Sequence, residues 1–221
     1  MTLSLVAHLD GAFGIVISSS SPAVASRCAH VRPGVGAVAS QNVTNPALGP
    51  ATLDALAAGA GPDAAIAAAL AADAYADYRQ VTAVDAAGRV SVHSGAQALG
   101  IHGASVGDGC VAAGNLLAGA DVLDAMVAGF ATASGPLEDR LLAALEAAVA
   151  AGGEAGPLRS AGLAVVEGAS WRTTDLRVDD HDQPIVELRR LWELWSPQKA
   201  DYLTRAVAPA SAPSYGVPGD E

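Results

Sequence analysis

The sequence predicts an α+β protein, a four-layer αββα sandwich in which two stacked antiparallel sheets are covered by helix pairs. Strand-like runs occur at both ends of the chain, and an alanine-rich helical stretch occupies the middle. Short turns join neighbouring strand runs, which favours antiparallel pairing because parallel strands need a long crossover. Two such sheets with helices outside would bury every apolar stripe of the chain.

The N-terminal part is expected to begin with a hairpin. Residues 3–9 and 12–19 have the composition of strands, and Asp10-Gly11 between them is a strong two-residue hairpin signal. The second run ends in the serines of positions 18–21, before Pro22. A third strand is predicted over 35–40, where small side chains permit close backbone approach.

The middle of the chain changes from strand to helix periodicity. Helices are expected over 52–58, which Gly59 would terminate, and over 62–76, which has proline in its first turn. Strands over 80–85 and 89–93 flank the turn Ala86-Ala87-Gly88. A further strand is expected near 110–113.

The C-terminal part predicts helices over 121–130 and 137–150, strands over 163–167 and 175–178, and an amphipathic helix over 184–195. Residues 1–195 are therefore expected to form a single domain. Proline, alanine and serine are frequent in 196–221, and this segment is predicted to be a mobile C-terminal tail.

Composition excludes several classes of partner. The formal net charge of −11 disfavours nucleic acid, which needs clustered Lys and Arg. A membrane is not an expected partner because no apolar run approaches a spanning length, and the N-terminus lacks the pattern of a signal peptide. The expected location is the cytoplasm, where Cys28 and Cys110 would be free thiols. No phosphate-binding loop or metal-ligand spacing is present, so we expect no cofactor and no metal.

Thr2 is the strongest candidate for chemistry. A threonine after Met1 is small enough for methionine aminopeptidase to remove Met1, which would free the α-amine of Thr2. An α-amine has a pKa of about 7.7 to 8.0 and can act as base for the hydroxyl of its own residue. One residue would then supply both nucleophile and base. The alternative is a threonine that merely begins a strand.

Several stretches along the chain resemble the DUF1028 family, whose members look like N-terminal nucleophile hydrolases of unassigned substrate. The resemblance extends over residues 2 to about 192 and depends on the order and spacing of these stretches. They are 2–7 (TLSLVA), 34–41 (GVGAVASQ), 44–46 (TNP), 79–81 (RQV), 114–118 (GNLLA) and 175–181 (DLRVDDH). The sequence departs from the family at 154–161 (EAGPLRSA), and a family tryptophan is replaced within 27–30. The resemblance supports the same αββα fold.

The resemblance implies that Thr2 attacks a small amide, imide or ureide, with a small molecule as substrate and a homo-oligomer as the expected assembly. Amide side chains would stabilise the oxyanion, and the candidates are Gln41, Asn42 and Asn115. The same residues can instead shape turns. Ser18 and Ser19 would bind the α-amine or simply end a strand, and Asn45 is a further substrate-binding candidate.

Two arginines and one acidic segment complete the candidates. Arg79 and Arg177 can bind a substrate carboxylate, or they can pair with the aspartates of 179–181 (Asp-Asp-His). That segment lacks the further ligands a metal would need, so helix capping and ion pairing are expected of it. Two rival functions stay open: a non-catalytic binding module or scaffold, and a hydrolase with Cys28 or a serine of 18–21 as nucleophile.

Overall fold

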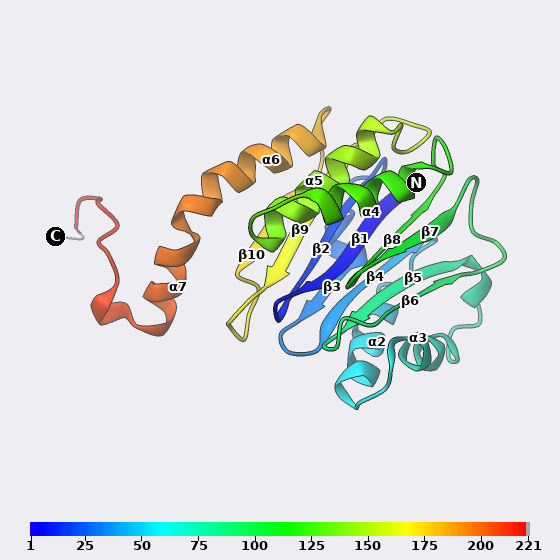
Figure 1. Ribbon diagram of the computed structural model, residues 1–221, viewed down its shortest axis with the longest axis horizontal. Helices are drawn as coiled ribbons and strands as arrows, with labels where there is room; N and C mark the ends of the chain where they lie inside the picture. The colour runs from blue at the N-terminus through cyan, green and yellow to red at the C-terminus, as the bar shows by residue number, and fades with distance from the viewer. Residues whose placement is uncertain (220–221) are drawn as a thin grey trace.

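The computed structural model describes residues 1–219, and within them two antiparallel sheets lie face to face with helices on both outer faces (Figure 1). The larger sheet has six strands in the order β10-β9-β2-β1-β8-β7. Their bounds are β1 Thr2–Leu9, β2 Ala12–Ser19, β7 Gly103–Gly107, β8 Cys110–Asn115, β9 Ser160–Val166 and β10 Thr174–Val178. The predicted αββα sandwich is confirmed.

The smaller sheet has four strands in the order β3-β4-β5-β6, with bounds β3 Ala29–Arg32, β4 Gly36–Asn42, β5 Arg79–Asp85 and β6 Val90–Ser94. Helices α2 (Leu48–Ala57) and α3 (Pro62–Leu70) cover its outer face (Figure 1). Buried leucines and isoleucine of these helices pack on Val38, Val81 and Ala83 of the sheet. The short helix α1 (Ala25–Cys28) leads into β3.

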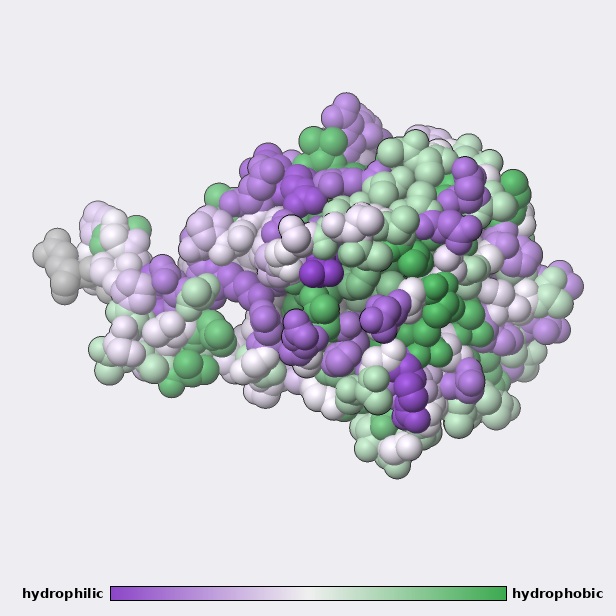
Figure 2. Space-filling model, in the orientation of Figure 1, coloured by the Kyte–Doolittle hydropathy of each residue, from purple (hydrophilic) through white to green (hydrophobic). Residues whose placement is uncertain are grey.

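The outer face of the larger sheet is covered by α4 (Val122–Thr132), α5 (Leu137–Ala150) and α6 (Pro184–Trp195). Met126, Leu141 and Leu188 of these helices are fully buried against the sheet. In the space-filling view, pale green covers much of α4 and α5, where alanine is frequent, whereas purple side chains follow α6 (Figure 2). Small side chains let helix and sheet approach closely, so this core depends on close packing more than on bulky residues.

Residues of β1 alternate between the two faces of the larger sheet, as the pleat of a strand requires. Leu3, Leu5 and Ala7 pack under the helices, and Val6 packs against the smaller sheet. Thr2 and Ser4 share the face of Val6 and therefore point between the sheets. This assignment determines which side chains can reach Thr2.

The β1–β2 register is fixed by the two-residue turn Asp10-Gly11, in which φ is 49° and 83°. Both angles lie in the left-handed region that a type I′ turn needs and that glycine adopts without strain. The turn pairs Leu9 with Ala12 and, at the other end, Thr2 with Ser19.

The structure differs from the sequence prediction in several elements. Strands β3 and β7 were not predicted, α2 begins at Leu48 and not at position 52, and α3 ends at Leu70 and not at 76. The segment after Trp195, expected as a tail, contains helix α7 (Lys199–Val207), where the ring of Tyr202 lies 5.2 Å from that of Trp195. Across residues 1–219, each helix is too short or too polar to cross a membrane.

Candidate functional site

Four buried polar residues form one row across the larger sheet. Asn115 of β8 pairs with Thr2 of β1, Thr2 pairs with Ser19 of β2, and Ser19 pairs with Ser160 of β9. Residues paired across an antiparallel ladder point to the same face. The row therefore lines the space between the sheets, at the end of the sandwich where the N-terminus lies (Figure 1). Each of the four side chains is at most 5% exposed.

The hydroxyl of Thr2 lies directly beside the Met1–Thr2 peptide bond. Thr2 Oγ1 donates to the carbonyl oxygen of Met1 over 2.7 Å and lies 3.5 Å from Ser19 Oγ. Ser19 Oγ donates to the same carbonyl oxygen. Two hydroxyls of the row thus converge on one carbonyl oxygen.

The hydrogen bonds behind Ser19 have a fixed direction. A hydroxyl carries one hydrogen, and that of Ser19 goes to Met1, so the 2.9 Å contact between Ser19 Oγ and Ser21 Oγ must be donated by Ser21. Arg27 Nη2 in turn donates to Ser21 Oγ over 2.7 Å. A guanidinium therefore stands at the start of a chain of hydroxyl donors that ends on the Met1 carbonyl, and such chains polarise their members.

Gln41 and Asn115 belong to a buried amide network beneath this row. Gln41 Nε2 donates to Gln80 Oε1 at 2.8 Å and to the Ala113 carbonyl at 3.1 Å, and Gln41 Oε1 accepts from Ser4 Oγ at 2.6 Å. Both N–H groups of Gln41 are thereby used within the protein. Asn115 Nδ2 donates to Gln80 Oε1 at 3.2 Å and has a second N–H group. Asn115 is therefore better suited than Gln41 to donate to a substrate.

Ser18 and Cys28 are placed differently from Thr2. Ser18 neighbours Ser19 along β2 and points to the helix-covered face, and its Oγ has no hydrogen-bond partner among residues 1–219. Cys28 is 3% exposed, and burial raises the pKa of its thiol, which disfavours the reactive thiolate.

Asn42, Asn45 and Arg79 hold the loops at the same end of the smaller sheet. Asn42 Nδ2 donates to the Tyr78 carbonyl at 2.7 Å, and its Oδ1 accepts from Leu99 N at 3.3 Å. Asn45 Nδ2 and Arg79 Nε each donate to Asp73 Oδ2 at 3.0 Å. The two asparagines therefore hold loops in place, which is the alternative to a role in binding substrate. Arg79 is bonded to Asp73, a carboxylate of the same chain.

Arg177 is exposed and pairs with Asp179 across 2.9 Å, as its ion-pair alternative predicts. Asp180 pairs with Arg159, and His181 Nδ1 accepts from the backbone N–H of Gln183 just before α6. The acidic segment is thus engaged in ion pairs and a turn. No group of three or more metal-ligating side chains occurs among the described residues 1–219.

The family model of DUF1028, a family of unknown function, matches residues 2–188. The chain belongs to DUF1028. The crystal structure of protein SPO2555 from Silicibacter pomeroyi, of the same family, is similar with a TM-score of 0.84 and 30% sequence identity, covering 91% of this chain and 92% of that chain. Comparison with curated proteins gives no match. The predicted family is therefore confirmed.

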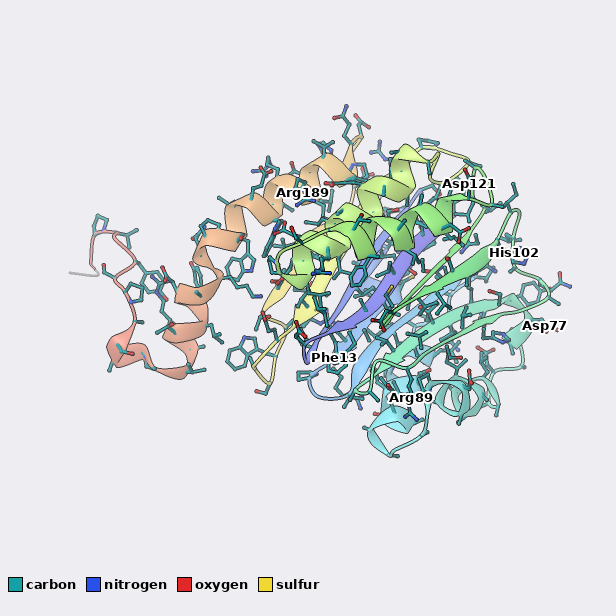
Figure 3. All side chains as sticks on the ribbon, viewed as in Figure 1. Phe13, Asp77, Arg89, His102, Asp121 and Arg189 are labelled. Atoms are coloured by element: carbon teal, nitrogen blue, oxygen red, sulfur yellow. The ribbon has the colours of Figure 1, made fainter. Side chains whose placement is uncertain are left out.

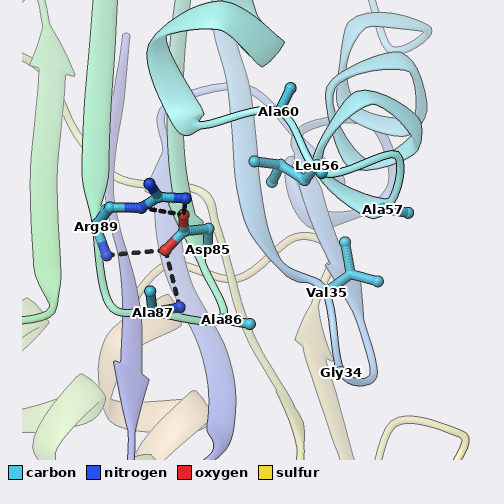
Figure 4. A pocket seen from close by; sticks show the side chains of 10 residues that line it. Gly34, Val35, Leu56, Ala57, Ala60, Asp85, Ala86, Ala87 and Arg89 are labelled. Carbon is cyan, nitrogen blue, oxygen red and sulfur yellow. Dashed lines mark hydrogen bonds and ion pairs between the residues drawn. The ribbon is translucent and has the colours of Figure 1, made fainter.

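A pocket, shown from close by in Figure 4, includes Asp85 in its lining. Asp85 pairs with Gly36 at the end of β4 that lies away from Gln41, so this pocket is at the opposite end of the sandwich from Thr2. Figure 3 shows Phe13 and Arg89 toward that end, and His102 and Asp121 toward the end of the N-terminus. The carboxylate of Asp85 lies in the pocket, but Arg89 Nε donates to it at 2.7 Å and the backbone N–H of Ala87 at 3.0 Å. Because these bonds tie down the β5–β6 turn, Asp85 is engaged as a structural group.

One buried residue next to Ser20, which follows Ser19 of the row, was not among the predicted site residues. Glu154 is 6% exposed, and its Oε2 accepts from the backbone N–H of Ser20 at 3.0 Å. Burial raises the pKa of Glu154 to about 7, an effect that the positive charge of the N-terminus and the Ser20 bond partly offset. The sequence of 154–161 had indicated only a departure from the family. The only sequence feature that could have drawn attention to Glu154 is its position as a single carboxylate after the uncharged run 147–153.

Proposed function

We propose that this protein is an amidohydrolase in which Thr2, after removal of Met1, is the nucleophile toward a small amide, imide or ureide. The observation that supports this most is the pair of hydroxyls on the Met1 carbonyl oxygen. Thr2 Oγ1 and Ser19 Oγ both donate to it, so this part of the molecule is built to accept a carbonyl group beside the hydroxyl of Thr2.

The proposed reaction uses the free α-amine as the base. Thr2 Oγ attacks the substrate carbonyl carbon while the α-amine takes the hydroxyl proton, and the resulting oxyanion accepts hydrogen bonds from Ser19 Oγ and the second N–H of Asn115. The C–N bond then breaks as the ammonium returns the proton to the leaving nitrogen. Water, deprotonated by the same amine, cleaves the ester and regenerates Thr2.

Ser19 is the better of the two oxyanion donors. The chain of donors from Arg27 through Ser21 ends on Ser19, so negative charge on the substrate oxygen would be stabilised by a positively charged group three hydrogen bonds away. Removing one preorganised donor of this kind lowers kcat roughly 10²–10³-fold. Gln41 and Gln80 would hold Asn115 and Ser4 in place without touching the substrate.

The test is turnover of a panel of small amides, imides and ureides by chains freed of Met1. Wild type should release amine or ammonia, Thr2→Ser should retain part of the activity, and Thr2→Ala should lose it by several orders of magnitude because nucleophile and base act as one unit. Melting temperatures should agree across the three proteins. Equal activity of Thr2→Ala and wild type would refute the mechanism, and binding without turnover by wild type would favour the binding-module alternative.

A further inference from the structure

Glu154 carries an unused acceptor next to Ser20, the residue that follows Ser19 of the row. Its Oε2 is bonded to Ser20 N, whereas Oε1 is buried and has no hydrogen-bond partner within residues 1–219. A buried carboxylate oxygen without a donor costs free energy, so an unpartnered one suggests a ligand that supplies a donor.

The backbone around Glu154 is held firmly. Glu154 forms a β-bridge with Leu117, Ala155 N donates to the Leu116 carbonyl at 2.9 Å, and Ala118 N donates to the Gly153 carbonyl at 2.9 Å. The segment after α5 is thereby tied to the segment after β8, which begins next to Asn115. The carboxylate is therefore fixed relative to the Asn115–Thr2–Ser19 row.

Met1 shows which kind of group this space accepts. Its carbonyl oxygen takes the hydroxyls of Thr2 and Ser19. Its side chain lies against Gly156, where an added Cβ would stand 2.5 Å from Met1 Cε. Gly156 is two residues after Glu154, so the Met1 side chain lies against the segment that carries this carboxylate. An aminoacyl group thus occupies the site with its carbonyl on the two hydroxyls and its side chain against the segment of Glu154.

We propose that, once Met1 has left, the same space binds the acyl part of an α-aminoacyl amide, with Glu154 receiving the free amino group next to the scissile carbonyl. This rests on the proposed function and adds the substrate class to it. Arg27 does not offer a competing site for anions, because its guanidinium is engaged by Ser21 Oγ and by the Pro22 and Ala23 carbonyls.

The experiment measures binding without turnover, on the Thr2→Ala chain whose loss of Met1 is verified by mass. Calorimetric titration at pH 7 compares L-methioninamide with N-acetyl-L-methioninamide, which lacks the basic amine. We expect the free amine to bind at least about tenfold more tightly, since a buried carboxylate makes a charge-assisted hydrogen bond with ammonium. Adding Glu154→Gln should remove this preference, whereas Glu193→Gln, on the exposed side of α6, should preserve it.

Equal affinity for the two ligands, or no measurable binding of either, would overturn the proposal. A Glu154→Gln change that weakens both ligands alike would also overturn it and would assign Glu154 to the α-amine of Thr2. The mechanism is judged separately, from hydrolysis of L-methioninamide by wild type and Thr2→Ala. Turnover that survives in Thr2→Ala sinks the nucleophile assignment while leaving the Glu154 preference intact.

Discussion

The side-chain amides of Gln41 and Gln80 connect the smaller sheet to the larger one at the Thr2 end of the sandwich. Gln41 Nε2 lies 2.8 Å from Gln80 Oε1, and the two amides donate to the consecutive carbonyls of Ala113 and Gly114 in β8 at 3.1 Å. Both glutamines are at most 1% exposed. A buried polar link specifies how the two sheets align, because its partners lose their hydrogen bonds if the sheets shift.

Gln41→Leu should therefore destabilise the protein despite its similar size. The substitution removes the bonds of Gln41 to Gln80 and Ala113 and strands the Ser4 hydroxyl, and a buried unsatisfied group costs about 1–3 kcal/mol. Urea unfolding should show a loss of at least about 2 kcal/mol. Gln97→Leu, at an exposed position, is the matched control and should change stability little. A Gln41→Leu midpoint equal to that of wild type would contradict a structural role for the network.

Met1 should be absent from active protein. As long as it is present, the nitrogen of Thr2 is an amide and cannot act as a base, and the Met1 carbonyl occupies both hydroxyls of the row. Intact-mass spectrometry of protein made in a bacterial cytosol should show loss of one methionine. Replacing Thr2 by the bulky Leu should block that removal and serves as the control. Full activity in a preparation that contains only the uncleaved chain would exclude the free-amine mechanism.

Protonation of Asp73 should lower the free energy of unfolding in acid. Hydrogen bonds from Arg79, Asn45 and Tyr75 N hold the pKa of Asp73 at about 2, below its ordinary 3.8. A group whose pKa is lowered by folding stabilises the protein above its unfolded pKa, so its contribution is complete above about pH 4 and disappears as pH falls toward 2.

The substitution that tests this is Asp73→Asn. It should cost about 1–2 kcal/mol at pH 6 and flatten the dependence of the unfolding free energy on pH between 4 and 2. Asp108→Asn, at an exposed site, should leave the wild-type slope. An unaltered slope in Asp73→Asn would show that other carboxylates carry the acid dependence.

Trp192 should be the most costly aromatic residue to truncate on α6. It is 4% exposed, packs with Leu188, and donates from Nε1 to Asp139 Oδ1 of α5 at 2.8 Å. Trp192→Ala should cost about 3–5 kcal/mol, measured by urea or thermal unfolding. Trp171→Ala removes a tryptophan that is 42% exposed and should cost far less. Similar losses from both substitutions would contradict the docking of α6 described here.

Local sequence signals predicted the elements they control. Helices α5 and α6 and strand β2 have the expected bounds, and β1 begins one residue earlier than expected. A two-residue turn and an amphipathic period of 3.6 can be recognised from a short stretch of sequence. Strands β3 and β7 were missed for the same reason. Each is short, and β7 reads Gly-Ala-Ser-Val-Gly, so its strand geometry comes from pairing with β8 and not from its own residues.

The candidate site was predictable only in part. Thr2 stands out by its position in the chain, and the expected turn at Asp10-Gly11 already implied that Thr2 faces Ser19. The roles of Gln41 and Glu154 depend on contacts across the sandwich with Gln80 and Ser20. Sequence spacing contains no information about such distances, which is why an oxyanion role was expected for Gln41 and none for Glu154.

The Asp10-Gly11 turn lies at the far end of β1 and β2 from Thr2, yet its length decides what Thr2 touches. One residue inserted there would shift the pairing of the two strands by a position and exchange the faces of their side chains. Ser18 would then take the place of Ser19, or Thr2 would turn toward the helices. The turn is thus a site where a change of length is not tolerated, and a survey of natural variation should find this loop constant in length.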